Sequence, residues 1–338
     1  MRLWCSQNWR FVSQNLDYGW LLPAMARLPL RWAYCLAQWR GRLNALWARD
    51  WVELSLGNSY IGKMCTSAFR EMFPSATEYQ IATWVRERYQ AVSAEELGAW
   101  LAIRGRLGEV PMMLEPIQHA MARRAPGRGL VVVMGHFDNL YFGLAGIARC
   151  GYPAYMLTTT VMHDERVHAR VQQFFRDKYA AYARISAGAA LLPNSSEAKK
   201  TFYEVLHQGG VVMVVSDTPS SVGSDKGTWV QWMGRQRKMA DGALRMAIDT
   251  DSELIAMQNW RNSKGEVEFA CSSLVDYRSF CGLGEAQTRE AVYAPLFAFL
   301  EAGIRAHPGR WWAAHLLGDF QTEPLGADTA VQSARSTS

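Results

Sequence analysis

The chain has 338 residues and a net charge of +5, with 49% hydrophobic and 20% charged residues. This composition allows a substantial packed core and excludes a largely disordered chain. No run of about 18 or more uncharged apolar residues occurs, so we expect no transmembrane helix. The start lacks the apolar region and cleavage site of a signal peptide, and the six cysteines form no CxxC pair. We therefore expect a cytoplasmic protein with reduced thiols and no metal site.

The first 49 residues are basic and aromatic. They contain seven arginines, no lysine, one acid (Asp17) and six of the 14 tryptophans. Arginine and tryptophan without acids suit an anionic membrane surface, and no nucleic-acid recognition motif accompanies them. We therefore expect no nucleic-acid partner, and we keep attachment to the inner face of the membrane as the alternative to a freely cytoplasmic protein.

Residues 30–51 have the periodicity of an amphipathic helix. Apolar side chains recur every three or four residues along one face, at Trp32, Leu36, Trp39, Leu43 and Trp47. Such a face packs on the protein's own core, lies in a membrane interface or lines an apolar substrate entrance. Capping boxes at 75–78 and 93–96 predict two further helix starts. We interpret residues 1–120 as a helical region that packs on the core or on a membrane surface.

The pattern changes at about residue 129, where apolar runs begin to alternate with helical stretches. The runs predict strands at 129–135, 152–159, 210–217, 253–260 and 266–276. Alternating strands and helices predict an α/β fold with a central, mainly parallel but mixed sheet flanked by helices, and with the helical region as an N-terminal extension. We assign residues 125–321 to this α/β domain. The tail, residues 322–338, has few large apolar residues, so we expect it to be disordered.

Polar side chains follow three of the predicted strands. His136 and Asp217 come at the ends of two apolar runs, and Arg261 closes a third. Ligands of open α/β sheets bind beyond the carboxyl ends of the strands, so these side chains are candidate site residues. A single histidine in such a position is more often structural than catalytic, so the position by itself assigns no function.

Several short motifs follow one another in a defined order. They are a helical segment at 68–89, His136 after a strand, the pair Lys199 and Lys200, a glycine pair and strand ending in an acid at 209–217, an apolar-glycine pair at 233–234, a small-residue helix at 239–247, a strand at 253–258 and an aromatic segment at 307–320. In this order they resemble the late acyltransferases of lipid A biosynthesis, which are relatives of the glycerolipid acyltransferases. The resemblance covers roughly residues 30–320.

The resemblance implies a glycerolipid-acyltransferase-like fold and the transfer of an acyl group from a carrier-protein thioester to a hydroxyl or amine. It implies His136 as general base, and imidazole suits that role near neutral pH. The acceptor attacks directly, and a strand end that opens a helix offers backbone N–H groups for the oxyanion. The expected partners are an acyl carrier protein or carrier domain and its acyl thioester. No cofactor is expected beyond the phosphopantetheine that the donor carries.

The histidine motif departs from the family pattern, because Tyr141 stands where the family has an acid five positions after the histidine. Asp138 is the first candidate for the group that orients the imidazole, although its side chain could instead cap the following helix. Asp217 or Tyr141 itself is the second candidate. In a third interpretation the reaction is lost and His136 is a relic.

The C-terminal segment departs as well. Family members carry basic residues soon after the aromatic pair, whereas this chain has "HLLGDF", in which Asp319 would repel a phosphate. We therefore expect an acceptor other than standard lipid A, such as a specialised metabolite or a carrier-bound intermediate. We expect His136 and Asp138 to be catalytic. The expected substrate-binding residues are Tyr141, Asp217, Lys200, Arg261 and His315.

Four functions fit these observations. The favoured one is an acyltransferase that uses an acyl-carrier-protein or CoA thioester as donor. A true lipid A or lysophospholipid acyltransferase is the alternative within the family. A non-catalytic carrier- or lipid-binding module, motivated by Tyr141, is the alternative from another class. A thioester hydrolase, in which water replaces the acceptor, is a narrower option.

Overall fold

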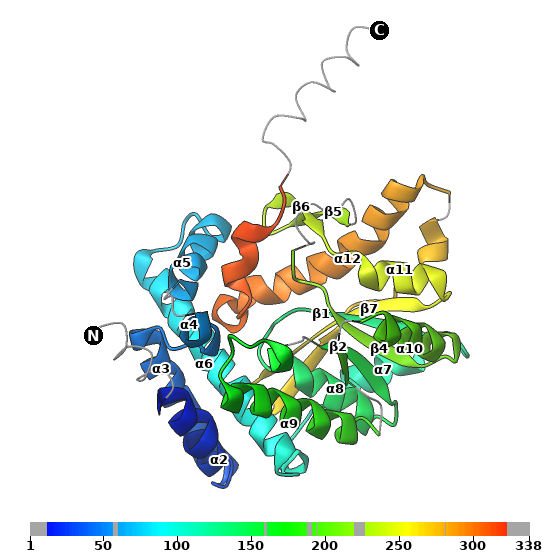
Figure 1. Cartoon of the computed structure of the whole chain (residues 1–338). Coiled ribbons are helices and arrows are strands. Elements are labelled where there is room, and N and C mark those ends of the chain that lie inside the picture. Colours follow the sequence, from blue (N-terminus) through cyan, green and yellow to red (C-terminus); the bar gives the residue numbers. More distant parts are fainter. Residues whose placement is uncertain are drawn as a thin grey trace, which may run out of the picture.

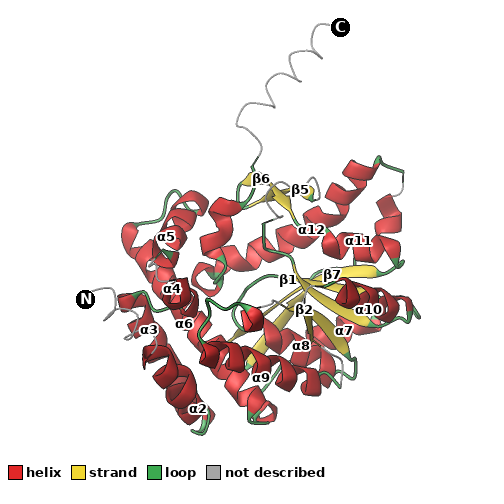
Figure 2. Cartoon of the chain, in the orientation of Figure 1, coloured by secondary structure: helices red, strands yellow, loops and turns green. Residues whose placement is uncertain are grey.

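A computed structural model describes residues 12–56, 60–158, 161–187, 191–193, 195–219, 227–280 and 282–322 (Figure 1). In this part of the chain a six-stranded sheet of order β3-β2-β4-β1-β7-β8 lies between two groups of helices (Figure 2). The first five strands are mutually parallel, and β8 runs antiparallel to β7. The predicted α/β fold with a mainly parallel, mixed sheet is therefore confirmed.

The elements have the following bounds. The sheet strands are β1 (Leu130–Met134), β2 (Ala154–Thr158), β3 (Leu191–Pro193), β4 (Val211–Val215), β7 (Glu253–Arg261) and β8 (Val267–Cys271), and β5 (Thr228–Trp232) forms a separate hairpin with β6 (Arg235–Met239). The helices are α2 (Leu22–Met25), α3 (Leu30–Trp47), α4 (Trp51–Leu56), α5 (Ile61–Met72), α6 (Glu78–Ile103), α7 (Glu115–Ala122), α8 (Leu140–Arg149), α9 (Ala169–Ile185), α10 (Ser196–His207), α11 (Gly242–Asp249) and α12 (Glu285–Ala306). Sequence patterns predicted neither β3 nor the hairpin.

Strand β1 shows why the sheet is buried on both faces. Leu130, Val132 and Met134 belong to one hydrophobic cluster, with side chains of α6, α7, α8 and α9. Val131 and Val133 belong to a second cluster, with side chains of α5, α10, α11 and α12. Successive side chains of a strand point to opposite faces, so a strand covered on both faces must be apolar throughout.

The N-terminal helices pack on the same core. Helix α3 lies along α6, and its Ala33, Tyr34 and Ala37 share a cluster with β1. A Cβ atom at Gly41 would overlap the backbone of Gln90, so this glycine permits the close approach of the two helices. The helix predicted over residues 30–51 ends earlier, because Ala48 adopts a left-handed conformation with φ 48°.

A helix begins near the first predicted start, at 75–78, but its cap lies two residues after Ser75, and the second predicted start, at 93–96, is wrong. One helix, α6, begins after Thr77, whose side chain and that of Gln80 form the capping box. Ser93 lies inside this helix, where it is buried and accepts a hydrogen bond from Arg40. The serine and the glutamate three residues after it therefore take part in packing between helices and do not mark the start of a helix.

None of the described helices has the length and apolar character needed to cross a membrane. The predicted tail, residues 322–338, lies outside the described residues except for residue 322.

Candidate active site

His136 lies directly beyond the end of β1, and Asp217 lies beyond the end of the neighbouring strand β4. The Nδ1 atom of His136 is 2.6 Å from Oδ1 of Asp217. The backbone N–H of His136 donates to Oδ2 of the same carboxylate at 2.7 Å. Asp217 thus fixes both the main chain and the ring of the histidine, and the bond at Nδ1 leaves Nε2 available for chemistry.

The Asp217 carboxylate is enclosed. It is fully buried, and its Oδ2 atom also accepts a hydrogen bond from the indole N–H of Trp311 at 2.7 Å. A Cβ atom at Gly135 would lie 3.0 Å from that oxygen, so a residue without a side chain lets the acid approach. Asp217 was predicted to bind substrate, but burial and these bonds make it a positioning residue for His136.

His136 lies in the wall of an apolar pocket of about 410 Å³. Its ring and that of Trp312 form a T-shaped, edge-to-face contact, with the ring centroids 4.5 Å apart. Most of the wall is hydrophobic and comes from helices α4, α6, α8 and α9, the ends of β2 and β4, and the C-terminal segment. The apolar lining residues are Trp51, Val52, Val92, Leu140, Tyr141, Met156, Leu157, Val161, Phe175, Tyr179, Val215, Trp312, Ala313 and Leu316.

Two buried ion pairs stand in the wall of this pocket. Lys178 contacts Glu95 at 2.5 Å, and Arg88 contacts Asp50 at 2.5 Å. Arg88 also donates to the carbonyl oxygen of Trp312 at 3.1 Å, which ties α6 to the segment beside His136. Sequence reasoning missed these residues, because charged side chains on α4, α6 and α9 look like ordinary surface residues until the helices pack.

His315, which was predicted to bind substrate, lines the same pocket. Its Nδ1 atom lies 3.2 Å from the carbonyl oxygen of Trp312. Burial, together with the positive charge of Arg88, lowers the pKa of His315 to about 4. The side chain is therefore neutral at pH 7 and can exchange hydrogen bonds with a ligand.

Tyr141 occupies the position of the family's acid, and it also lines the pocket. Its ring stacks on Tyr182 with a centroid separation of 4.8 Å, and the ammonium of Lys178 lies 4.1 Å from its centroid. Burial raises the pKa of Tyr141 well above its ordinary value, so its hydroxyl stays protonated. The tyrosine contributes aromatic surface to the pocket, whereas Asp217 holds the imidazole.

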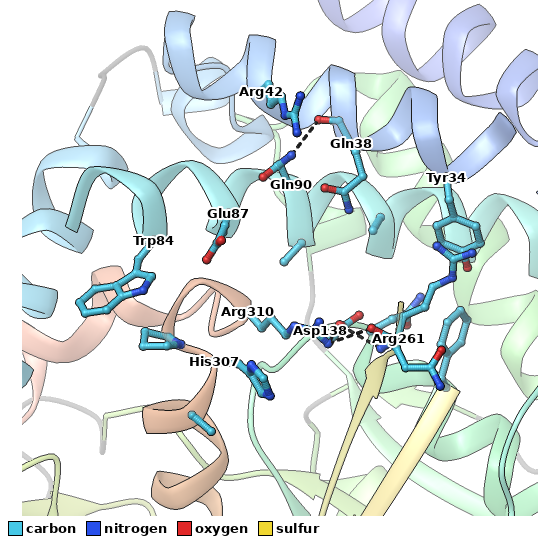
Figure 3. A pocket seen from close by; sticks show the side chains of 17 residues that line it. Tyr34, Gln38, Arg42, Trp84, Glu87, Gln90, Asp138, Arg261, His307 and Arg310 are labelled. Carbon is cyan, nitrogen blue, oxygen red and sulfur yellow. Dashed lines mark hydrogen bonds and ion pairs between the residues drawn. The ribbon is translucent and has the colours of Figure 1, made fainter. Parts of the chain in front are cut away.

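Asp138 is not the partner of His136. Its Oδ2 atom lies 3.2 Å from Arg310 and accepts a hydrogen bond from the backbone N–H of Arg261 at 3.3 Å. Its φ of 47° places it in the left-handed region, which aspartate tolerates better than most residues. The N-cap of α8 is Asn139, so Asp138 performs neither role expected of it. The left-handed turn directs its carboxylate into a different cavity, which it lines with Arg261 and Arg310 (Figure 3).

Lys200 lies away from both cavities. Its side chain is 79% exposed on α10 and pairs loosely with Glu204 at 3.9 Å. Lys200, predicted to bind substrate, therefore lines neither cavity, and Arg261 lines the cavity that does not contain His136. Within the described ranges no three or more His, Cys, Asp or Glu side chains gather as metal ligands would.

Comparison with known families bears on this geometry. Residues 73–317 match the family model described as bacterial lipid A biosynthesis acyltransferase. The matched segment includes β1, β4 and the His136–Asp217 pair. A search of curated proteins found no match.

Proposed function

Because the chain belongs to the bacterial lipid A biosynthesis acyltransferase family, we propose that it moves an acyl group from a carrier-protein thioester to a hydroxyl or amine acceptor. His136 is the general base, and Asp217 holds its ring. The observation that carries this proposal is the 2.6 Å contact between Nδ1 of His136 and Oδ1 of Asp217 at the wall of an apolar pocket.

The chemistry follows from this pair. Nε2 of His136 takes the proton from the acceptor as its oxygen or nitrogen attacks the thioester carbonyl, and the Asp217 carboxylate stabilises the imidazolium that forms. The tetrahedral intermediate then collapses, the carbon–sulfur bond breaks, and His136 returns the proton to the departing thiolate. The N-terminus of α8, whose first residue Leu140 lines the pocket, offers the positive end of a helix dipole to the oxyanion.

The apolar pocket suits the acyl chain of the donor. Its hydrophobic wall removes alkyl surface from water, and the phosphopantetheine thioester would enter with its carbonyl toward His136. A CoA thioester presents the same reacting group, so the carrier protein is the proposed donor and CoA the alternative. Asp319 is exposed in the C-terminal segment, where its negative charge would repel a phosphate group. The proposed acceptor is therefore a molecule other than standard lipid A.

We further propose that the protein works at an anionic bilayer, because its N-terminal helices expose apolar side chains. Among the described residues, eleven of the fourteen exposed large hydrophobic side chains lie between residues 12 and 47. They are Val12, Leu16, Trp20, Leu21, Leu28, Trp32, Leu36, Trp39, Leu43, Leu46 and Trp47, which we call the interfacial face.

The charges around the interfacial face favour a bilayer over a second copy of the chain. Arg27, Arg31 and Arg42 are exposed on the same segment. Its single acid, Asp17, pairs with the buried Arg40 at 2.5 Å. Two such faces would repel each other, whereas anionic lipid headgroups attract arginine and the headgroup region accommodates tryptophan.

Mass spectrometry tests the transfer. The full chain is incubated with acyl-carrier-protein thioesters of several chain lengths and a panel of hydroxyl and amine acceptors. Wild type is expected to give acylated acceptor, His136→Ala is expected to give none, and His207→Ala, at the exposed end of α10, serves as the matched control. Full turnover by His136→Ala would overturn the mechanism. Free acid in place of acylated acceptor would indicate a hydrolase, and tight thioester binding without turnover would indicate a binding module.

A further inference from the structure

A second, larger cavity lies on the other side of the turn that follows His136. It has a volume of about 610 Å³ and is bounded by α3, α6, the end of β7 and the segment around Pro308–Arg310. Figure 3 shows Asp138, Arg261 and Arg310 together on one side, with Gln38 and Glu87 on the helices opposite. The proposed transfer reaction uses none of these side chains.

Three arginines make this cavity cationic. Arg42 reaches it from α3, on the wall opposite Arg261 and Arg310 (Figure 3), and its guanidinium lies 5.2 Å from the centroid of the Trp39 ring without an ion pair to a described carboxylate. Arg261 lies with its guanidinium 3.6 Å from the centroid of the Tyr34 ring and donates from Nε to the carbonyl of Gly265. Its remaining N–H groups point to no described carboxylate within ion-pair distance. A half-buried guanidinium without a carboxylate partner is a strong hydrogen-bond donor to an anion.

The third arginine is only partly neutralised. Arg310 contacts Asp138 at 3.2 Å and the carbonyl oxygen of Arg261 at 3.1 Å through the same nitrogen, Nη1. Burial raises the pKa of Asp138 although Arg310 lies beside it, so this carboxylate is an imperfectly stabilised internal counterion. Glu87, the other acid at the cavity, has an exposed surface, but burial raises its pKa and Arg310 interacts with it, so it also partly offsets the arginines.

An unsatisfied polar atom lies beside the cavity. The hydroxyl of Tyr34 is buried, with 4% of the residue exposed, and no described residue accepts or donates a hydrogen bond to it. A buried hydroxyl without a partner costs free energy, so a ligand that hydrogen bonds to it is favoured. Tyr34 lines the cavity beside Arg261, and a ligand gains this hydrogen bond if the hydroxyl, which is sealed from solvent, becomes accessible from the cavity.

Trp312 separates this cavity from the histidine pocket. Its indole N–H donates to the carbonyl oxygen of Asp138 at 3.0 Å, and its ring packs against His136. Trp312 and His136 line the apolar pocket, whereas Asp138 and Arg310 line the cationic cavity. The two spaces therefore share a wall and differ in chemistry.

We propose that the cationic cavity is a second binding site, which takes a polar molecule bearing a phosphate or carboxylate group. The anion sits beside Arg261 and Arg310, and Arg42, on the opposite wall, adds to the positive potential of the cavity. The proposal does not depend on acyl transfer, because binding can be measured without a thioester.

A ³¹P NMR titration with inorganic phosphate tests the site in the full chain. Wild type is expected to bind saturably, Arg261→Gln is expected to weaken binding about tenfold or more, and Arg42→Gln is expected to weaken it several-fold. Arg42 is exposed, so its replacement leaves the fold intact even if that of Arg261 does not. Arg31→Gln on the same helix, outside the cavity, is the matched control and is expected to bind like wild type.

A gain of affinity gives a sharper test. Asp138→Asn removes the internal counterion and leaves an oxygen that can accept from the backbone N–H of Arg261, so it is expected to bind phosphate several-fold more tightly than wild type. His136→Ala is expected to bind phosphate like wild type while losing transfer, which separates this proposal from the proposed function.

Further binding experiments identify the kind of molecule that carries the anion. Acetate competition shows whether a carboxylate suffices, and glycerol 3-phosphate compared with a lysophosphatidic acid below its micelle concentration separates a free phosphate from a lipid headgroup. The proposal is overturned if wild type shows no saturable binding, or if Arg42→Gln and Arg261→Gln both bind phosphate as wild type does.

Discussion

His136 and Asp217 meet through two hydrogen bonds, one at the imidazole Nδ1 (2.6 Å) and one at the backbone N–H (2.7 Å). The second bond matters as much as the first, because it fixes the peptide from which the ring projects. Trp311 holds the same carboxylate from a third direction. The imidazole therefore has one tautomer and one orientation before substrate arrives, which reduces the reorganisation needed in the transition state.

Replacing Asp217 should remove the fixed tautomer and orientation of the His136 ring. Asp217→Asn is expected to lower the transfer rate by roughly 10²–10⁴-fold while the fold persists, because asparagine keeps the shape and loses the acceptor that fixes the tautomer. ¹⁵N NMR of the histidine ring should show a change from Nδ1–H to a mixture of tautomers. Asp249→Asn, at the exposed end of α11, is the control. Loss of transfer in Asp138→Asn but not in Asp217→Asn would assign the orienting role to Asp138 instead.

A side chain at position 135 is expected to disturb the contact between His136 and Asp217. In Gly135→Ala the new Cβ would stand 3.0 Å from Oδ2 of Asp217, so the carboxylate must move by a few tenths of an ångström. We expect kcat to fall on the order of tenfold, with KM for the donor nearly unchanged, because positioning is disturbed and the pocket is not. Gly108→Ala is the control, since a Cβ there meets no atom within 4 Å. Equal kcat values for the two variants would contradict the argument.

The histidine pocket should make the protein acid-sensitive. His315 has a pKa of about 4 in the folded protein and an ordinary value of 6.5. Between these values the unfolded chain binds more protons than the folded one, so the free energy of unfolding falls as pH drops from about 6.5 to about 4. His315→Gln should flatten this part of a plot of urea midpoint against pH. An unchanged slope would mean that other groups control acid unfolding.

The buried pair of Asp50 and Arg88 should be costly to break. Both side chains are 2% exposed, so Asp50→Asn leaves an uncompensated guanidinium in the core and is expected to lower the free energy of unfolding by about 3–5 kcal/mol. Urea unfolding followed by circular dichroism measures the loss. The exposed pair of Arg70 and Glu78 provides the contrast, and Arg70→Gln should leave the midpoint unchanged. Similar midpoints for both variants would show that the buried pair is dispensable.

The interfacial face is expected to bind anionic vesicles. Replacing Trp39 and Trp47 by serine removes two exposed aromatic rings and should lower the fraction that sediments with phosphatidylglycerol vesicles at least about tenfold, without changing the urea midpoint. Tyr79→Ser, which removes a ring that is 78% exposed on α6, is the control. Sedimentation of the double variant at the wild-type level would rule this face out as the membrane contact.

The periodicity of apolar residues was a good guide to strands and a poor guide to helix ends. The run at β1 is continuous because both faces of the strand are covered, and such a run can be seen without a structure. The serine at 93 fitted a helix start equally well, yet it faces Arg40 inside α6. Capping boxes depend on a few local atoms, so packing between helices readily overrides them.

The partner of the histidine shows the same limit. Proximity in sequence favoured Asp138, whereas 81 residues separate His136 from Asp217. The choice depends on the order of strands in the sheet, which places β4 beside β1 with Val215 opposite Met134. It also depends on the left-handed turn at Asp138, which directs that carboxylate away from the ring.

The sequence alone determined the α/β class, the position of His136 at a strand end, the family resemblance and the Arg- and Trp-rich N-terminus, because hydrophobic period and motif order are properties of a linear chain. Only the tertiary structure decided which acid reaches His136, that the tryptophan face of α3 is exposed, and that three arginines from distant segments share one cavity. These outcomes depend on strand order, helix packing and one backbone conformation, and such long-range contacts have no local signature.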